Sequence, residues 1–166
     1  MTLTTHAVVG AAAASLFPQQ PIAAFAAGFV SHLLIDAIPH WQDGSTMLRS
    51  LRTDPRDPLK TDMILGKKFL LDLVYLGSEA GAGLALAVGI FCFWLFHLPL
   101  IVIFFGVCGG LLPDALHFVY FKTRSKLLEP FERFHIWIQR EYPSPLFLSV
   151  EALLAASLIG ILKLFY

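Results

Sequence analysis

Apolar residues run along this chain in stretches that approach the thickness of a bilayer, with few charges between them. Hydrophobic residues make up 57% of the 166 residues and charged residues only 14%, and the mean hydropathy is +0.70. A soluble globular domain is nearer half apolar and a quarter charged. Because about 20 apolar residues are needed to cross a bilayer, the sequence predicts an integral membrane protein. The length favours one domain over residues 1–166.

Proline, glycine and charge divide the chain into about five principal helices, so we expect an all-α membrane bundle. Pro21 is well placed at the first position of a helix, while Gly109-Gly110 and Pro113 indicate a break or kink. Two polar segments are expected to be loops. The first carries at most one short helix, and the second carries an amphipathic helix at 131–138. The expected helices are 3–16, 21–38, 69–96, 99–112 with a continuation over 113–121, and 146–166.

Lys and Arg residues are concentrated in the two polar segments. The segment 41–68 carries six and the segment 122–145 carries five, whereas the connections at 17–20 and 97–98 carry none. The positive-inside rule therefore predicts both long loops in the cytoplasm and both short connections outside. The first helix is short for a span, so we expect it to tilt, to thin the bilayer or to lie sheltered inside the bundle. Zero net charge argues against a nucleic-acid partner.

The run His32-Leu-Leu-Ile-Asp36-Ala-Ile-Pro-His40 places three potential metal ligands at the end of an apolar segment. Ionisable groups at membrane depth are costly and indicate a functional site. On a helix His32 and Asp36 are one turn apart and share a face. Pro39 disfavours helical geometry before it, so His40 is expected just past the helix end.

The predicted topology brings five of the six histidines to the cytoplasmic side, and only His97 lies on the other. Asp114 and His117 are spaced i, i+3 and share a helix face. Imidazoles and carboxylates bind zinc well, and mixed sets also serve manganese or iron. We therefore predict a centre for one or two divalent ions, with zinc preferred, held by His6, His32, Asp36, His40, Asp114 and His117.

Two further residues are candidates for catalysis. Glu79 is the favoured buried general base or extra ligand, and His135 is expected to complete the centre or to hold substrate. Asp72 and Glu151 could serve as ligands, bases or partners of a histidine. Metal-activated water makes hydrolysis the natural reaction class, and flanking basic residues would steer an anionic substrate.

The main interpretation is thus a membrane-bound metal-dependent hydrolase that acts on a phosphoester or related bond of a lipid or membrane-associated anion. Two alternatives remain open. A metal-binding transport or sensory protein predicts a polar path across the bundle, which the almost entirely apolar residues 84–106 disfavour. A structural membrane module would use the same polar residues only to tie its helices together.

The segments Thr5-His6-x-x-x-Gly10, His32-x-x-x-Asp36-x-x-x-His40 and Pro113-Asp114-x-x-His117 resemble the LexA-regulated inner-membrane metal-dependent hydrolases. The resemblance extends from His6 through the segment 122–145 and implies a small multi-helix membrane protein with a metal-dependent activity. The His-x-x-x-Asp pattern is also similar, over about ten residues, to the helix-borne ligands of zinc-dependent phospholipase C and the S1/P1 nucleases. In that group a trinuclear zinc site hydrolyses phosphodiesters.

Overall fold

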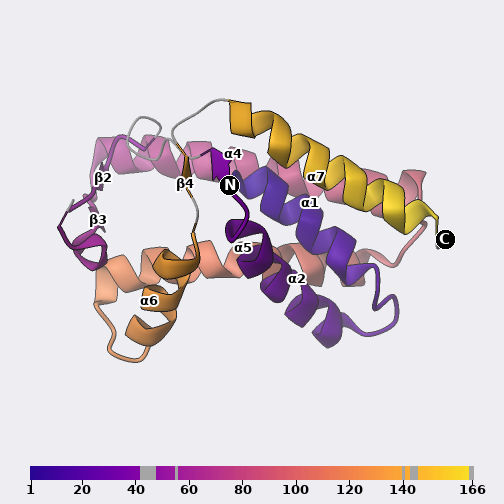
Figure 1. Cartoon of the computed structure of the whole chain (residues 1–166), viewed down its shortest axis with the longest axis horizontal. Coiled ribbons are helices and arrows are strands. Elements are labelled where there is room, and N and C mark those ends of the chain that lie inside the picture. Colours follow the sequence, from indigo (N-terminus) through magenta and orange to yellow (C-terminus); the bar gives the residue numbers. More distant parts are fainter. Residues whose placement is uncertain (42–47, 55, 140, 143–145, 165–166) are drawn as a thin grey trace.

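The computed structural model describes residues 1–41, 48–54, 56–139, 141–142 and 146–164, and most of them are helical. The all-α class is confirmed. Within this part of the chain, five long helices lie together, and the short helix α6 stands at one end of them (Figure 1). The helices are α1 (Leu3–Ala14), α2 (Pro21–Asp36), α4 (Lys67–Val88), α5 (Leu100–Thr123), α6 (Glu129–Ile138) and α7 (Leu146–Lys163); a π-helical segment, η2 (Gly89–Trp94), extends α4.

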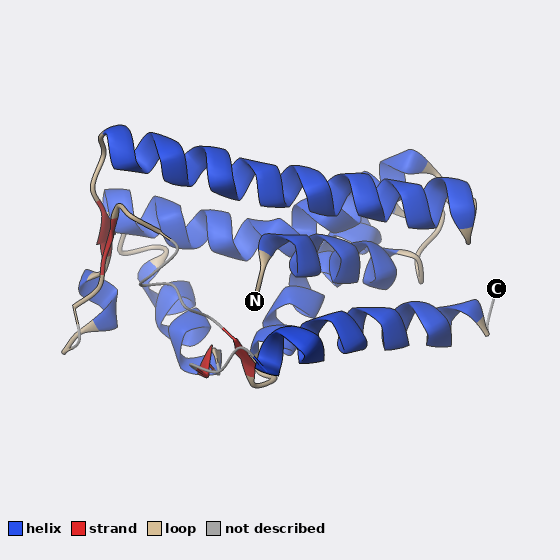
Figure 2. Ribbon diagram, turned by 90° about the horizontal axis from the view of Figure 1, so that it is seen from above, coloured by secondary structure: helices blue, strands red, loops and turns tan. Residues whose placement is uncertain are grey.

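Short strands pair within the polar segments and form two separate sheets (Figure 2). Strand β1 (His40–Trp41) pairs in parallel with β4 (Glu141–Tyr142). Strand β2 (Leu51–Arg52) pairs antiparallel with β3 (Asp62–Met63), and the 3-10 helix η1 (Pro58–Lys60) lies between them. The segment 40–66, expected to be a solvated loop, is therefore partly ordered by backbone pairing.

The C-terminal end of α5 holds this hairpin in place. Lys122 Nζ donates a hydrogen bond to Asp62 Oδ1 at 2.6 Å, and Arg124 donates to the carbonyl oxygen of Thr61 at 2.8 Å. The hydrogen bond from the Lys122 ammonium lowers the pKa of Asp62 below its ordinary value. Two basic residues that the sequence offers for substrate steering therefore bind the protein's own loop.

Helix α1 lies inside the bundle and contacts α2, α4, α5 and α7. The side-chain oxygen of Thr2 caps its first turn by accepting from the Thr5 backbone N–H at 3.2 Å. Nearly every residue from His6 to Ala14 is buried. The helix is short, but neighbouring helices surround it. Of the three expectations for this short helix, shelter inside the bundle is the one observed.

Glycines let α1, α2 and α5 approach until their backbones touch. A Cβ on Gly10 would lie 2.6 Å from the Gly106 carbonyl oxygen, and one on Gly110 would lie 2.6 Å from the His6 carbonyl oxygen. A Cβ on Gly28, in α2, would clash with the same Gly106 carbonyl oxygen. Such contacts exclude any larger residue and are typical of helix packing in membranes. They bring His6 and His32 against the middle of α5.

Helix α5 continues through Pro113, so of the break or kink predicted at Gly109-Gly110 and Pro113, the break is wrong. Proline removes one backbone hydrogen bond, but packing outweighs that loss here. Pro113 is buried, and the turn before it lies against α1 and α2 through its glycines. By contrast, Pro39 has the expected effect, because α2 ends at Asp36 and His40 follows the helix.

Within the described residues, two helices are long and apolar enough to cross a membrane, Lys67–Trp94 and Leu100–Thr123. Helices α1 and α2 are apolar but shorter. The outer face of the first span carries large apolar side chains that are more than half exposed, among them Leu70, Val74, Phe93 and Trp94. A contiguous apolar surface of this kind requires cover by lipid or by another protein.

Candidate metal centre

Four helices bring seven metal-ligating side chains together beside the first turns of α1. Helix α1 supplies one histidine, and α2, α5 and α6 each supply one carboxylate and one histidine spaced a single helical turn apart. These side chains form three overlapping groups, each with ligand atoms within 4.8 Å of one another. The residues are His6, His32, Asp36, Asp114, His117, Glu132 and His135.

Three of the ligand atoms form an equilateral triangle. His32 Nε2, His135 Nε2 and Asp36 Oδ2 lie 3.2 Å from one another along each side. In a tetrahedral zinc site with bonds of about 2.0–2.1 Å, neighbouring ligand atoms are about 3.3–3.4 Å apart. The triangle therefore has the dimensions of one face of such a tetrahedron. All three side chains are buried.

A backbone carbonyl fixes the orientation of His32. Its Nδ1–H donates to the Gly110 carbonyl oxygen at 2.7 Å, because a carbonyl can only accept. In the neutral ring this leaves the Nε2 lone pair directed at Asp36 and His135. A lone pair that faces a carboxylate is repelled unless a proton or a cation lies between them. Metal-bound histidines in proteins commonly donate their second nitrogen to a backbone carbonyl in this way.

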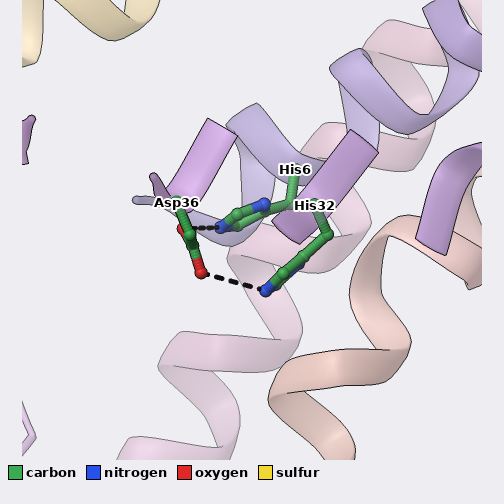
Figure 3. A group of neighbouring side chains, drawn as sticks. All are labelled: His6, His32 and Asp36. Carbon is green, nitrogen blue, oxygen red and sulfur yellow. Dashed lines mark ion pairs between the residues drawn. The ribbon is translucent and has the colours of Figure 1, made fainter. Parts of the chain in front are cut away.

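His6 lies against His32 and reaches the other oxygen of Asp36. The two imidazole rings stack with centroids 3.8 Å apart and an interplanar angle of 18°. His6 Nε2 is 3.3 Å from Asp36 Oδ1 (Figure 3). Asp36 thus faces His6 with one oxygen and the triangle with the other. The Met1 amino nitrogen lies 3.8 Å from the same Oδ1.

The α5 and α6 pairs extend the centre toward solvent. Asp114 Oδ1 lies 3.8 Å from His32 Nε2, and His117 Nδ1 lies 2.6 Å from Glu132 Oε1. Glu132 and His135 are fully buried, whereas 31% of the Asp114 side chain and 26% of the His117 side chain are exposed. The centre is therefore closed on the α1 side and open on the α5 side.

Five of the six predicted ligands and His135 meet in this centre, but His40 does not join them among the described residues. His40 is buried on β1, and its Nδ1 lies 2.8 Å from the Ile38 carbonyl oxygen. The bend after Pro39 turns it out of the α2 face that carries His32 and Asp36.

Glu79 lies outside the three groups and binds the start of α1. Its Oε2 accepts from the Leu3 backbone N–H at 3.2 Å, and its Oε1 accepts from the Tyr75 hydroxyl at 2.9 Å. A carboxylate at a helix N-terminus is stabilised by the helix dipole. This contact gives Glu79 a structural role that its position in the sequence does not reveal.

The two other acids considered from the sequence are also engaged elsewhere. Glu151 Oε2 accepts from the Thr2 backbone N–H at 3.2 Å and from the Thr5 hydroxyl at 3.0 Å. Asp72 accepts from the backbone N–H groups of Arg49 and Ser50 at 3.0 and 2.7 Å. Both carboxylates satisfy backbone donors, Glu151 at the start of α1 and Asp72 in the segment 41–68.

Glu132 is the ligand candidate that the sequence interpretation missed. The segment Glu132-x-x-His135 repeats the i, i+3 spacing of Asp114-x-x-His117. That repeat was the available signal, but charges in an amphipathic helix usually face solvent. Burial of this pair becomes apparent only when α6 is packed against α5.

Comparison with protein-family models, with curated proteins and with solved structures finds no match to this chain. The functional argument therefore depends on the geometry of the centre.

Proposed function

We propose that this protein is a membrane-bound metal-dependent hydrolase whose centre is built on His32, Asp36 and His135. The observation that carries the proposal is the 3.2 Å triangle of buried ligand atoms. Four imidazoles and three carboxylates form a donor set that suits zinc, with manganese or iron as alternatives.

The protein side chains have distinct roles in this proposal. A bound divalent ion supplies water of lowered pKa and stabilises negative charge on a phosphoryl oxygen. The Gly110 carbonyl holds the His32 ring in its tautomer, and His6 orients Asp36. Asp114 is part-exposed beside His32, so it is placed to accept a proton from water and return it to solvent.

The proposed substrate is a phosphoester or related bond in a lipid or another membrane-associated anion. Asp114 lies about 21 Å along α5 from Leu100, at 1.5 Å per residue. In a hydrocarbon core about 30 Å thick, this depth is close to one edge. The open side of the centre would therefore lie within reach of headgroups and water.

The membrane location and orientation belong to the same proposal. Two apolar helices of sufficient length and the exposed apolar face of α4 support insertion. The Lys and Arg residues of the two polar segments support an orientation in which the centre faces the cytoplasm. A transport function has less support, because residues 84–106 offer almost no polar side chain for a path through the other half.

Metal analysis tests the proposal directly. The full chain is purified in detergent, reconstituted with zinc chloride, separated from free ion and analysed for bound metal. We expect wild-type protein to retain zinc and the His32→Ala/Asp36→Ala double variant to lose the ion held by the triangle. A screen with phosphomonoester, phosphodiester and carboxylic ester substrates then identifies the reaction class.

His97→Asn provides the matched control, because His97 lies at the opposite end of α5 and Asn tolerates its left-handed backbone (φ 52°). This variant should keep zinc and activity. A folded wild-type protein that binds no zinc, manganese or iron would contradict the metal centre. Zinc bound without activity toward any substrate class would contradict the hydrolase assignment.

A further inference from the structure

We propose that the centre holds two divalent ions and that the second one is bound by His117 and Glu132, with His135 between the two. This inference rests on the proposed metal-dependent function and deepens it. It assigns the buried triangle to one ion and the open α5–α6 side to another, which faces the substrate.

Glu132 is the first observation for a second ion. The side chain is fully buried, yet neither of its carboxylate oxygens makes a hydrogen bond to the described part of the chain. A buried carboxylate without compensation is costly, so a native structure rarely retains one without a reason. A bound cation would satisfy both oxygens.

The geometry between Glu132 and His117 is the second observation. Glu132 Oε1 and His117 Nδ1 approach to 2.6 Å, but neither atom meets hydrogen-bond geometry with any described partner. The two atoms lie close together without one donating toward the other. Neighbouring ligand atoms of a tetrahedral site are about 3.3–3.4 Å apart, so these two atoms would move apart by less than 1 Å to bind a shared ion.

His135 lies between the residues proposed for the two ions. Its ring centroid lies 5.3 Å from that of His32 and 5.5 Å from that of His117. Its Nε2 faces Asp36 and His32, while its Nδ1 is buried without a hydrogen-bond partner in the described residues. The ring therefore has one nitrogen in the triangle and a second that remains to be satisfied.

Charge balance favours two ions over one. The carboxylates Asp36, Asp114 and Glu132 bring a side-chain charge of −3, because the described Lys and Arg ion pairs go to Asp57, Asp62 and Glu129 instead. The Met1 amino group beside Asp36 adds one positive charge. One divalent ion then leaves the centre with no net charge, whereas two leave it with a net charge of +2, which attracts an anionic phosphoester.

Exposure then distinguishes the two ions. His6, His32, Asp36 and His135 are buried, so an ion among them reaches solvent only past Asp114. His117 and Asp114 are part-exposed, so an ion beside them keeps a position for water or substrate. The His117–Glu132 ion is accordingly the one that contacts the phosphoester.

Zinc stoichiometry tests this inference. We expect two equivalents in the wild-type chain purified in detergent and one in each of the variants Glu132→Gln and His117→Ala. Glu129→Gln is the matched control on α6, because Glu129 is exposed and pairs with Arg133, and it should keep two. With cobalt chloride in place of zinc, Glu132→Gln should lose one set of visible absorption bands and keep the other. Far-UV circular dichroism verifies that each variant is folded.

The outcomes separate the two proposals. Wild-type protein without any bound metal would contradict the proposed function itself. One equivalent in wild-type protein that Glu132→Gln retains would overturn the second ion and leave the function standing. Loss of both ions in folded Glu132→Gln and His117→Ala proteins would overturn the assignment of separate sites.

Discussion

At the scale of single residues, one backbone oxygen determines what His32 can do. The Gly110 carbonyl accepts from His32 Nδ1–H and so leaves the Nε2 lone pair free to face Asp36 and His135. Without a cation, three ligand atoms at 3.2 Å would have to share protons in a buried space. Loss of a group that hydrogen-bonds a metal-binding histidine typically lowers metal affinity about 10–100-fold. The donor set is thus arranged before any ion binds.

Glu79→Gln separates a catalytic role from a structural role at this scale. The amide oxygen of glutamine can still accept from the Leu3 N–H, but it cannot serve as a base. We expect metal content and rate to stay within a few-fold of wild type, and the stability to fall by about 0.3–1 kcal/mol from the lost charge at the α1 N-terminus. Steady-state hydrolysis with the best substrate of the screen, and thermal unfolding in detergent, provide the readouts. A rate loss of about 100-fold or more at normal metal content would instead identify Glu79 as the general base.

At the scale of elements, the centre depends on how closely α1 and α2 approach α5. Gly10, Gly28, Gly106 and Gly110 permit backbone contact, and that contact sets the position of His6 and His32 relative to Asp114. A shift of α2 against α5 by the width of a methyl group would separate His32 from the Gly110 carbonyl oxygen and from Asp114. Packing at the glycines and metal binding are therefore coupled.

Gly110→Ala should disturb both properties, because its Cβ would lie 2.6 Å from the His6 carbonyl oxygen. We expect a loss of about 1–3 kcal/mol in stability, as for other overpacked cores, together with weaker zinc binding. Gly81→Ala is the matched control in α4, since a Cβ there meets nothing within 4 Å, and it should preserve both. Thermal unfolding in detergent and zinc titration measure the two effects. Equal behaviour of the two variants would show that the close approach at Gly110 is unimportant.

The same elements explain how much the sequence could predict. Spacing within a helix identified His32 with Asp36 and Asp114 with His117, because i, i+3 and i, i+4 positions share a face wherever the helix lies. It could not assign Glu132 or Glu79, whose partners His117 and Leu3 come from other helices. Likewise, Pro113 predicted a break from local chemistry alone, while contacts with α1 and α2 preserve the helix. Helix positions were predictable, and contacts between helices were not.

At the scale of the whole molecule, ionisable side chains lie inside and large apolar side chains lie outside, which is the opposite of the distribution in a soluble protein. Histidines and carboxylates occupy the interior beside α1, while Leu70, Val74, Phe93 and Trp94 face outward. This distribution suits a bilayer around α4 and α5 and a polar centre shielded from lipid by the bundle. The proposed orientation then depends on the two Lys- and Arg-containing segments.

Cysteine labelling tests that orientation. In a chain with Cys92 and Cys108 changed to alanine, Gln19→Cys and Thr53→Cys each introduce one exposed thiol without changing a charge. In right-side-out vesicles a membrane-impermeant maleimide should label Gln19→Cys and reach Thr53→Cys only after detergent is added. The physical reason is that eleven of the twelve Lys and Arg residues lie in 41–68 and 122–145, and such segments are retained in the cytoplasm. The opposite pattern would place the metal centre on the outer side, and equal labelling of both thiols in sealed vesicles would contradict a membrane-spanning chain.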